Sequence, residues 1–361
     1  MSLPEPARIL KLLLAEACNF RRFPWKRDFF STVRGDLVES VGSADMSAKP
    51  CRALLDIGKP CTFLPLAFFL LLFPVSACSE DQNTKAETTE PQLTQDATSL
   101  SLTIQLAIWG DADARVSIGL MYLKGEGLPQ DYSEAVQWFR LAAEQGHADA
   151  QDTLGLAYLN GEGVPQDYSE AVKWFRLAAE QGHADSQVTL GLMYRNGEGV
   201  PQDYSEAVKW IRLAAEQGHA DAQNGLGAMY ANGEGVPQDH GEALKWYHLA
   251  AEQGHAYAQN SLGIMYAIGE GVPQDLGEAV KWYRLAAEQG YAYAQINLGI
   301  MYRNGEGVPQ NYKEAYAWFN IAAAKGHENA AQNRDIVASK LNPKTLAEAQ
   351  DLSREYYEKF K

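Results

Sequence analysis

The stretch GEGVPQDYSEAVKWFRLAAEQGHAD, residues 161–185, recurs almost unchanged along the chain at a fixed spacing. Its tryptophan returns every 36 residues, and a tyrosine ahead of it keeps the same step. Self-similarity at one period, without insertions, indicates stacked units that bury their apolar faces against their neighbours. The repeated residues are Trp138, Trp174, Trp210, Trp246, Trp282 and Trp318, with Tyr122, Tyr158, Tyr194, Tyr230, Tyr266 and Tyr302.

Each unit carries the signals for two helices. Asp167 followed three residues later by Glu170 is typical of a capping box, which begins a helix. Apolar residues then recur at spacings of three and four, which predicts an amphipathic helix that ends at Gly182 in the left-handed conformation. A second helix is predicted from about Ala184 to Asn196. Six such helical hairpins fill residues 111–326.

The repeated sequence resembles that of a known family. Leu-Gly-x-Met-Tyr-x-x-Gly-x-Gly-Val-Pro-x-Asp-Tyr-x-x-Ala-x-x-Trp, followed by Ala-Ala-x-x-Gly-x-Ala-x-Ala, is similar to the Sel1-like repeat, a relative of the tetratricopeptide repeat. The resemblance covers residues 111–326 and implies an all-α, right-handed α-solenoid. Residues 101–110 are expected to form an N-terminal cap, and residues 327–361 are expected to form C-terminal capping helices with a polar outer side.

The segment ahead of the repeats has the features of an export signal. The apolar run at residues 63–75 is shorter than the roughly 20 residues of a membrane span and follows basic residues, as in a signal peptide. Val75-Ser76-Ala77-Cys78 resembles a bacterial lipobox, which implies a lipid on Cys78. A buried apolar segment is the alternative.

The boundaries of this front end follow from the same features. A start at Met46 gives ordinary signal-peptide proportions for residues 46–77, so residues 1–45 are interpreted as a mis-annotated upstream extension; a small N-terminal domain is the alternative. Residues 78–100 are predicted to be a lipidated cysteine followed by a flexible polar linker. Ser79 after the cysteine implies an outer-membrane lipoprotein that faces the periplasm.

Composition and spacing exclude several classes of function. From residue 79 onward, 21 Lys and Arg face 39 Asp and Glu, so nucleic acid is not an expected partner. The four cysteines lie ahead of the repeats, so disulfides do not hold the array. Histidines that recur once per unit stand about 10 Å apart when units stack, too far to share a metal ion. Neither a catalytic elbow nor a phosphate-binding loop occurs, so no enzyme activity, cofactor or small-molecule substrate is expected.

Four positions of the Ala184-type helix vary from unit to unit and lie within one helical face of roughly 80°. They are the third, sixth, tenth and thirteenth places of each unit, counted from Asp111. The third place is Asp in units one to four but Tyr257 and Tyr293 in the last two. In tetratricopeptide relatives this face lines a concave groove for peptides, so the resemblance implies a groove with the expected partner-binding residues Arg195, Tyr257, Asn260, Ile264, Tyr293, Ile296, Ile300 and Arg303.

We therefore expect a non-enzymatic scaffold, anchored by lipid to the bacterial envelope, that binds a partner protein or peptide mainly at the C-terminal third of the groove. Two alternatives stay open. Tyr257 and Tyr293 could merely pack on one another across adjacent units. The whole array could also be a structural spacer, or an assembly factor for envelope or polysaccharide export, without a specific groove ligand.

Overall fold

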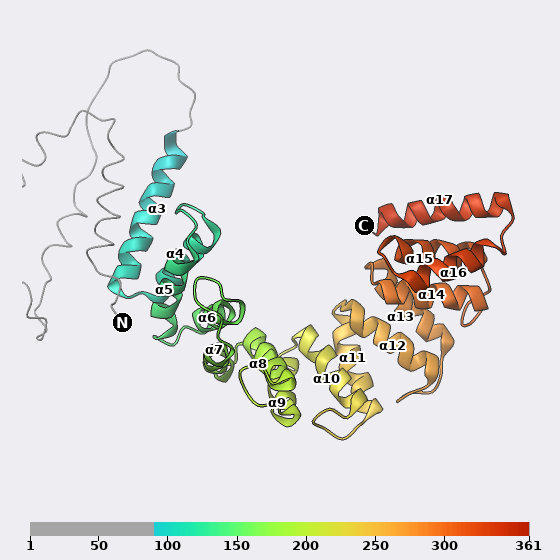
Figure 1. Ribbon diagram of the computed structural model, residues 1–361, viewed down its shortest axis with the longest axis horizontal. Coiled ribbons are helices and arrows are strands. Elements are labelled where there is room, and N and C mark those ends of the chain that lie inside the picture. The colour runs from blue at the N-terminus through green and yellow to red at the C-terminus, as the bar shows by residue number, and fades with distance from the viewer. Residues whose placement is uncertain (1–89, 361) are drawn as a thin grey trace, which may run out of the picture. The chain divides into compact units, whose positions relative to one another are not determined.

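The computed structural model describes residues 90–360, with side chains from residue 99 onward. The described residues form fifteen helices and no strand, joined by turns (Figure 1). Beyond α3, the helices come in the pairs that the repeat predicts, and α16 and α17 follow the last pair. Their bounds are α3 Glu90–Trp109, α4 Ala112–Lys124, α5 Tyr132–Ala143, α6 Ala148–Asn160, α7 Tyr168–Glu180, α8 Ala184–Asn196, α9 Tyr204–Glu216, α10 Ala220–Asn232, α11 His240–Glu252, α12 Ala256–Ile268, α13 Leu276–Glu288, α14 Ala292–Asn304, α15 Tyr312–Ala324, α16 Glu328–Ala338 and α17 Pro343–Lys359.

Each odd-numbered helix of the array begins with the predicted side-chain cap, but the second hydrogen bond of a capping box does not form at Asp167. The Asp167 carboxylate accepts from the amides of Ser169, at 2.9 Å, and Glu170, at 3.1 Å. The return bond of a capping box is absent, because the Asp167 amide already donates to the Tyr158 carbonyl at 2.9 Å. Glu170 instead pairs with Lys173 at 2.5 Å. The turn between the two helices of a unit therefore consumes the amide that the capping box needs.

The predicted helix ends are confirmed. Gly182 has φ +92° and ends α7, and Gly197 has φ +76° and donates its amide to the Met193 carbonyl at 2.9 Å. Both residues satisfy carbonyls that a helix end leaves unpaired, in a backbone conformation that costs glycine little.

Neighbouring helices approach closely because each even-numbered helix of the array has a glycine where the next helix crosses it. A Cβ added to Gly155 would stand 2.8 Å from the ring of Phe175, which is fully buried. Leu154 beside it is also fully buried. The core is therefore a continuous series of small clusters, each shared between consecutive helices.

Polar side chains tie each unit to the next. Arg140 Nη2 donates to the Tyr158 hydroxyl at 2.6 Å, and equivalent pairs recur 36 residues later at each following junction. The buried Gln151 donates to the Ala143 carbonyl at 3.0 Å and accepts from Gln181 at 2.7 Å. Gln151 thus has partners for both its donor and its acceptor, and burying it leaves no unsatisfied amide. At the last junction the equivalent Gln295 Oε1 is buried without a partner, because Lys325 stands where earlier units have the donating glutamine.

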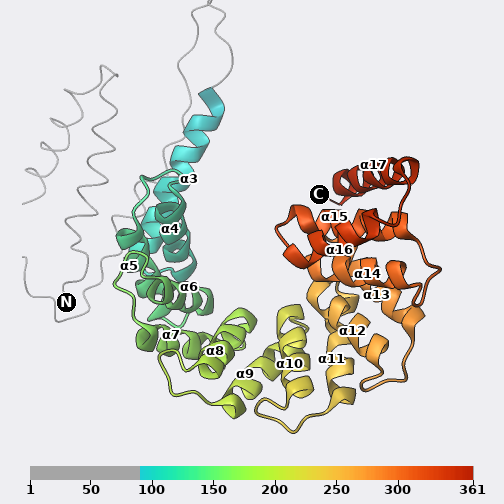
Figure 2. The ribbon, with the colours of Figure 1, turned by 45° about the vertical axis from the view of Figure 1, so that its right-hand side comes forward.

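Residues 92–360 belong to one compact unit, in which the helix pairs follow one another along a curve (Figure 2). The even-numbered helices α6, α8, α10 and α12 lie on the inner side of the curve, and α7, α9, α11 and α13 lie on the outer side. These residues are an α-solenoid. We call the inner side, formed by the even-numbered helices, the concave face.

The ends of the array differ from the repeats. α3 begins at Glu90, so part of the predicted linker, residues 90–100, is helical and continues into the predicted cap. The run from Gln92 to Ser99 has neither glycine nor proline, and Pro91 stands in the first turn of α3. The cap helix can therefore extend backward despite the few large apolar residues of this run. At the other end, α17 packs on α15, and the rings of Tyr356 and Phe360 lie 4.7 and 5.8 Å from that of Trp318.

The predicted extension at residues 1–45, the signal peptide at residues 46–77 and Cys78 lie outside the described residues. Within residues 90–360, no helix has both the length and the apolar character needed to cross a bilayer.

Candidate binding surface

The variable face lies on the concave side, and part of it is an exposed apolar row. Leu120, Leu156, Leu192 and Ile264, all at the tenth place, are 37–41% exposed. Tyr257 and Tyr293 at the third place are 52% and 58% exposed. Single exposed apolar side chains are common at protein surfaces, but these six gather on one side of the array, with one each on α4, α6, α8 and α14 and two on α12. We call these six residues the apolar row.

The third place is not free of packing, although the sequence suggested that it was. His147 is the N-cap of α6: its Nδ1 accepts from the Ala150 amide at 3.3 Å, which leaves Nε2 to donate to Asp113 at 2.9 Å. The same arrangement joins His219 to Asp185. These histidines cap a helix and bind the preceding unit, which explains why Asp and His recur together; the other pairs are His183 with Asp149 and His255 with Asp221.

In the last units, aromatic contacts replace the Asp and His pair. Tyr291 stands where earlier units have histidine, and its ring lies 5.5 Å from that of Tyr257 and 5.7 Å from that of Tyr293. Tyr293 in turn contacts His327 at 5.3 Å. Burial, with a smaller contribution from the neighbouring phenols, raises the pKa of Tyr291 to about 12, so the ring stays uncharged at neutral pH. The two predicted tyrosines therefore do pack across units, through Tyr291, and they keep about half of their surface exposed.

Three predicted groove residues are less accessible than the sequence suggested. Asn260 is 5% exposed and accepts from Asn297 at 3.0 Å, because it lies at the contact between α12 and α14. Ile296 and Ile300 are half-buried against a cluster that includes Phe319 and Val337. The capping helices cover these positions of the last unit, an effect that a comparison of repeat units alone does not reveal. The C-terminal third of the surface thus keeps Tyr257, Ile264 and Tyr293 as exposed apolar groups.

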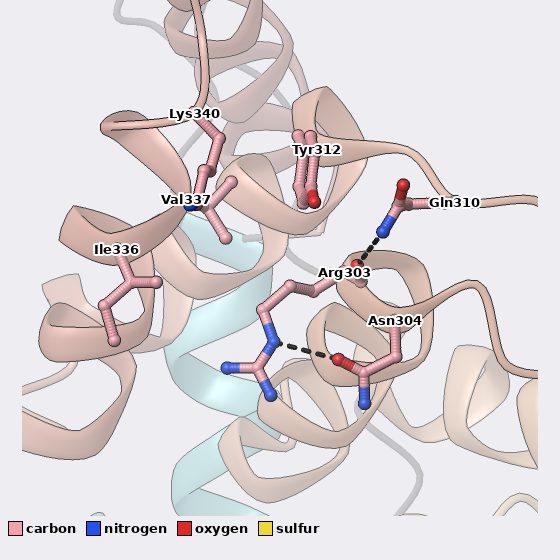
Figure 3. Close-up of a pocket in the computed structure, with 7 residues that line it drawn as sticks. All are labelled: Arg303, Asn304, Gln310, Tyr312, Ile336, Val337 and Lys340. Atoms are coloured by element: carbon pink, nitrogen blue, oxygen red, sulfur yellow. Dashed lines mark hydrogen bonds between the residues drawn. The ribbon is translucent and has the colours of Figure 1, made fainter.

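Arg303 lies beside a hollow of about 450 Å³ between the end of α14, the start of α15 and the end of α16 (Figure 3). Its Nε donates to Asn304 at 3.1 Å, and its carbonyl accepts from Gln310 at 2.9 Å. Nη1 donates to Asn333 on α16. These three partners of Arg303 are uncharged, and its side chain holds the C-terminal cap, which sets it apart from the centre of the concave face.

Arg195 lies at a second hollow, of about 390 Å³, near the middle of the concave face. Its Nε donates to Glu234 at 2.9 Å, so the pair presents no net charge. α8, α10 and α12 contribute most of the wall, and this hollow brings two of the predicted residues, Arg195 and Tyr257, together. The lining residues are Val188, Leu192, Arg195, Ile211, Asp221, Ala222, Asn224, Gly225, Ala228, Asn232 and Tyr257. We call this cavity the central hollow.

One carboxylate of the variable face, that of Asp152, has a pKa above its usual value. Burial raises the pKa of Asp152, whereas the hydrogen bond that Ser186 Oγ donates to it, at 2.6 Å, and nearby His183 act in the opposite direction. The other acids of this face stand at the third place and are 70–89% exposed. The concave face of units one to four is thus lined by solvated negative charge on one side of the apolar row.

Metal chemistry has no assembled site in this part of the chain. Within the described residues, no group of three or more His, Cys, Asp or Glu side chains is placed to hold an ion. The recurring histidines are each used by the helix cap and the neighbouring aspartate.

Consecutive helix pairs of equal length, stacked through shared cores and presenting one variable face, define a helical repeat protein of the solenoid class. The family model of the Sel1 repeat matches six times without a gap, at residues 112–147, 148–183, 184–219, 220–255, 256–291 and 292–327. The chain belongs to the Sel1 repeat family. Proteins of this family generally mediate contacts between proteins. The matched units begin one residue after the boundary expected from the sequence.

Two solved structures are similar over most of the repeats. A protective antigen present in uropathogenic Escherichia coli strains, which displays an SLR fold, is 40% identical with a TM-score of 0.66, over 71% of this chain and 56% of that one. A Sel1 repeat protein from Oxalobacter formigenes is 35% identical with a TM-score of 0.56, over 64% of this chain and 94% of that one. This chain thus spans little more than half of the E. coli antigen. The search of curated proteins found no match.

Proposed function

We propose that this protein is a scaffold that binds a partner polypeptide along its concave face. The apolar row carries the proposal: six large side chains on five of the six even-numbered helices of the array stay 37–58% exposed, although the fold buries the apolar surface on the other side of the same helices. A partner segment laid along the row would remove this surface from water and so gain affinity.

We further propose that a lipid on Cys78 holds the scaffold to the outer membrane, facing the periplasm. The support is the order of basic, apolar and small residues before Cys78, followed by a polar segment. Fractionation of cells that express Cys78→Ser tests this assignment, because retention of that variant in the membrane would refute it.

The chain offers a matched test of the binding face. Leu120, Leu156 and Leu192 on the concave face are 37–41% exposed, and Leu177, Leu213 and Leu249 on the outer helices are 43–44% exposed. The triple variant L120E/L156E/L192E places three carboxylates in the apolar row, and L177E/L213E/L249E places them on the outer side. We expect the concave variant to lower the yield of a partner crosslinked in cells about tenfold or more, since the few buried contacts dominate affinity.

The outer variant serves as the control for charge and for stability. Both variants should melt near the temperature of the unmodified protein, because all six residues are exposed. Equal loss of the partner in both variants would contradict a concave binding face. If the unmodified protein itself yields no partner, the result favours a structural spacer.

A further inference from the structure

The central hollow exists because the fourth unit lacks side chains that its neighbours have. At the seventh and tenth places, α8 has Thr189 and Leu192, whereas α10 has Gly225 and Ala228. In α12 these places are again filled, by a serine and an isoleucine. The two small residues line the hollow of about 390 Å³. The two small residues that open this cavity are therefore specific to the fourth unit and are not part of the repeat pattern.

Packing does not account for the glycine. A Cβ added to Gly225 would lie 3.7 Å from Ile211, which is ordinary contact, whereas a Cβ on Gly227 would meet the Tyr247 ring at 2.9 Å. Gly227 is thus required for the approach of α11, and Gly225 is not. Glycine inside a helix lowers stability by about 1 kcal/mol relative to alanine. At residue 225 no internal contact requires glycine, so nothing in the packing offsets this loss.

The lining of the hollow indicates what it can hold. Val188, Leu192 and Ala228 give it an apolar wall. Asn224 also lines it, and the Asn224 Oδ1 atom is buried without a hydrogen-bond partner among the described residues. The equivalent Asn260 does have such a partner, because Asn297 donates to it. The hollow thus has a largely apolar wall with few polar groups, as small-ligand and side-chain pockets do, and the unsatisfied Asn224 Oδ1 lies buried beside it.

The charges around the hollow indicate which kind of side chain a partner can place beside it. Arg195 is neutralised by Glu234, whereas Asp221 at the rim is 70% exposed, and Asp185, one turn before Val188, is 73% exposed. Each of these carboxylates binds one histidine of the following unit and still faces solvent. A cationic side chain beside the hollow would therefore be attracted, and an anionic one would be repelled.

We propose that the central hollow takes one bulky apolar side chain of a partner segment, with a Lys or Arg next to it in that segment facing Asp221 and Asp185. This inference deepens the proposed function and rests on it. At about 390 Å³, the cavity is near the lower end of the 300–1,000 Å³ range of ligand pockets, which suits a single side chain and not a whole element.

The test fills the cavity with the residue that other units already carry. Random dodecapeptides displayed on phage are selected on the full chain, and one enriched peptide is synthesised and titrated against the unmodified protein, A228L and A231L. Leu156 and Leu192 show that leucine fits the tenth place, and Leu123 and Leu159 show that it fits the thirteenth, so we expect both variants to fold and to melt near the unmodified protein. Ala231 lies one turn further along α10 and does not line the hollow.

We expect the enriched peptides to share a large apolar residue flanked by Lys or Arg, and their affinity to fall as salt is raised. A228L should weaken binding about 10- to 100-fold, the value of one fully buried large side chain, and A231L should change it by no more than about twofold. Equal binding to A228L and the unmodified protein, or acidic flanking residues, would overturn the inference and leave the scaffold function standing.

Two other results would also overturn it. Selection of no peptide at all, in a protein that also yields no crosslinked partner, would refute the scaffold function and the inference together. A concentration-dependent dimer in sedimentation, abolished by A228L, would show that a second copy of this chain is the occupant of the hollow.

Discussion

G163A should destabilise the array far more than G127A, although both glycines occupy the same place in their turns. Gly163 has φ +72° and Gly127 has φ +76°. Alanine at either site would be held in the left-handed backbone conformation, which costs a similar 1–2 kcal/mol, roughly, in both variants. A Cβ on Gly163 would also stand 2.2 Å from the Tyr132 carbonyl oxygen of the preceding unit, whereas one on Gly127 would meet nothing within 4 Å. We expect G163A to lose about 2–3 kcal/mol beyond the loss in G127A, because the two units must separate.

Urea denaturation of both variants, followed by circular dichroism, measures the difference. The pair is well matched because Gly127 is in the first unit and no repeat precedes it, so only the contact between units distinguishes the two sites. If G127A and G163A lost the same free energy of unfolding, the Gly163 turn would not contact the preceding unit closely, and the stacking geometry would be wrong.

The double variant Y356A/F360A should release the C-terminal end of the array. Trp318 is 1% exposed because the rings of these two residues cover it from α17. Removing both rings opens the last unit to water and should cost about 3–5 kcal/mol there, as for other large aromatic residues replaced by alanine. Since repeats contact only their neighbours, faster amide exchange is expected in α15 and little change in α7 and α9.

Hydrogen exchange with mass spectrometry reads both regions in one experiment. W109A is the aromatic control at the other end, because Trp109 is 71% exposed and its removal should change stability by less than about 0.5 kcal/mol. Uniform acceleration of exchange along the whole array of Y356A/F360A would contradict the local capping role of α17.

The repeat made the fold predictable. The period of 36 residues, the cap at Asp167 and the glycine at 182 each predicted an element boundary that the structure confirms, because local backbone chemistry determines such boundaries. The capping box was predicted only in part, since the turn from the preceding helix uses the Asp167 amide. The backward extension of α3 to Glu90 was missed, because a composition poor in large apolar residues does not exclude a helix that continues from a packed cap.

The position of the variable face could be predicted from the sequence, but its side-chain contacts could not. The four variable places belong to the even-numbered helices, which lie on the inner side of the curve. The sequence could not show that His147 would bind Asp113, or that Tyr291 would lie between Tyr257 and Tyr293. Two of these contacts join residues 34 positions apart, and the third joins Tyr291 to Tyr293, whose relative orientation depends on how the units stack. The joint change from His and Asp to Tyr and Tyr between units was the signal that could have revealed them.

The central hollow was not predicted either, and its signal was present in the sequence. Gly225 and Ala228 are the smallest residues found at their places in any unit, but a cavity follows only when the flanking helices keep their larger side chains. Arg195 was predicted as a groove residue and does line this hollow, although Glu234 holds it.

A photocrosslinking amino acid at residue 192, compared with the same amino acid at residue 213, tests the central claim most directly. Both leucines are exposed, at 41% and 44%, and they lie on the concave and the outer side of the same unit. Illumination of intact cells should give a discrete adduct with a partner polypeptide from residue 192 and none from residue 213. An adduct from residue 213 alone, or equal adducts from both, would contradict a partner that lies along the concave face.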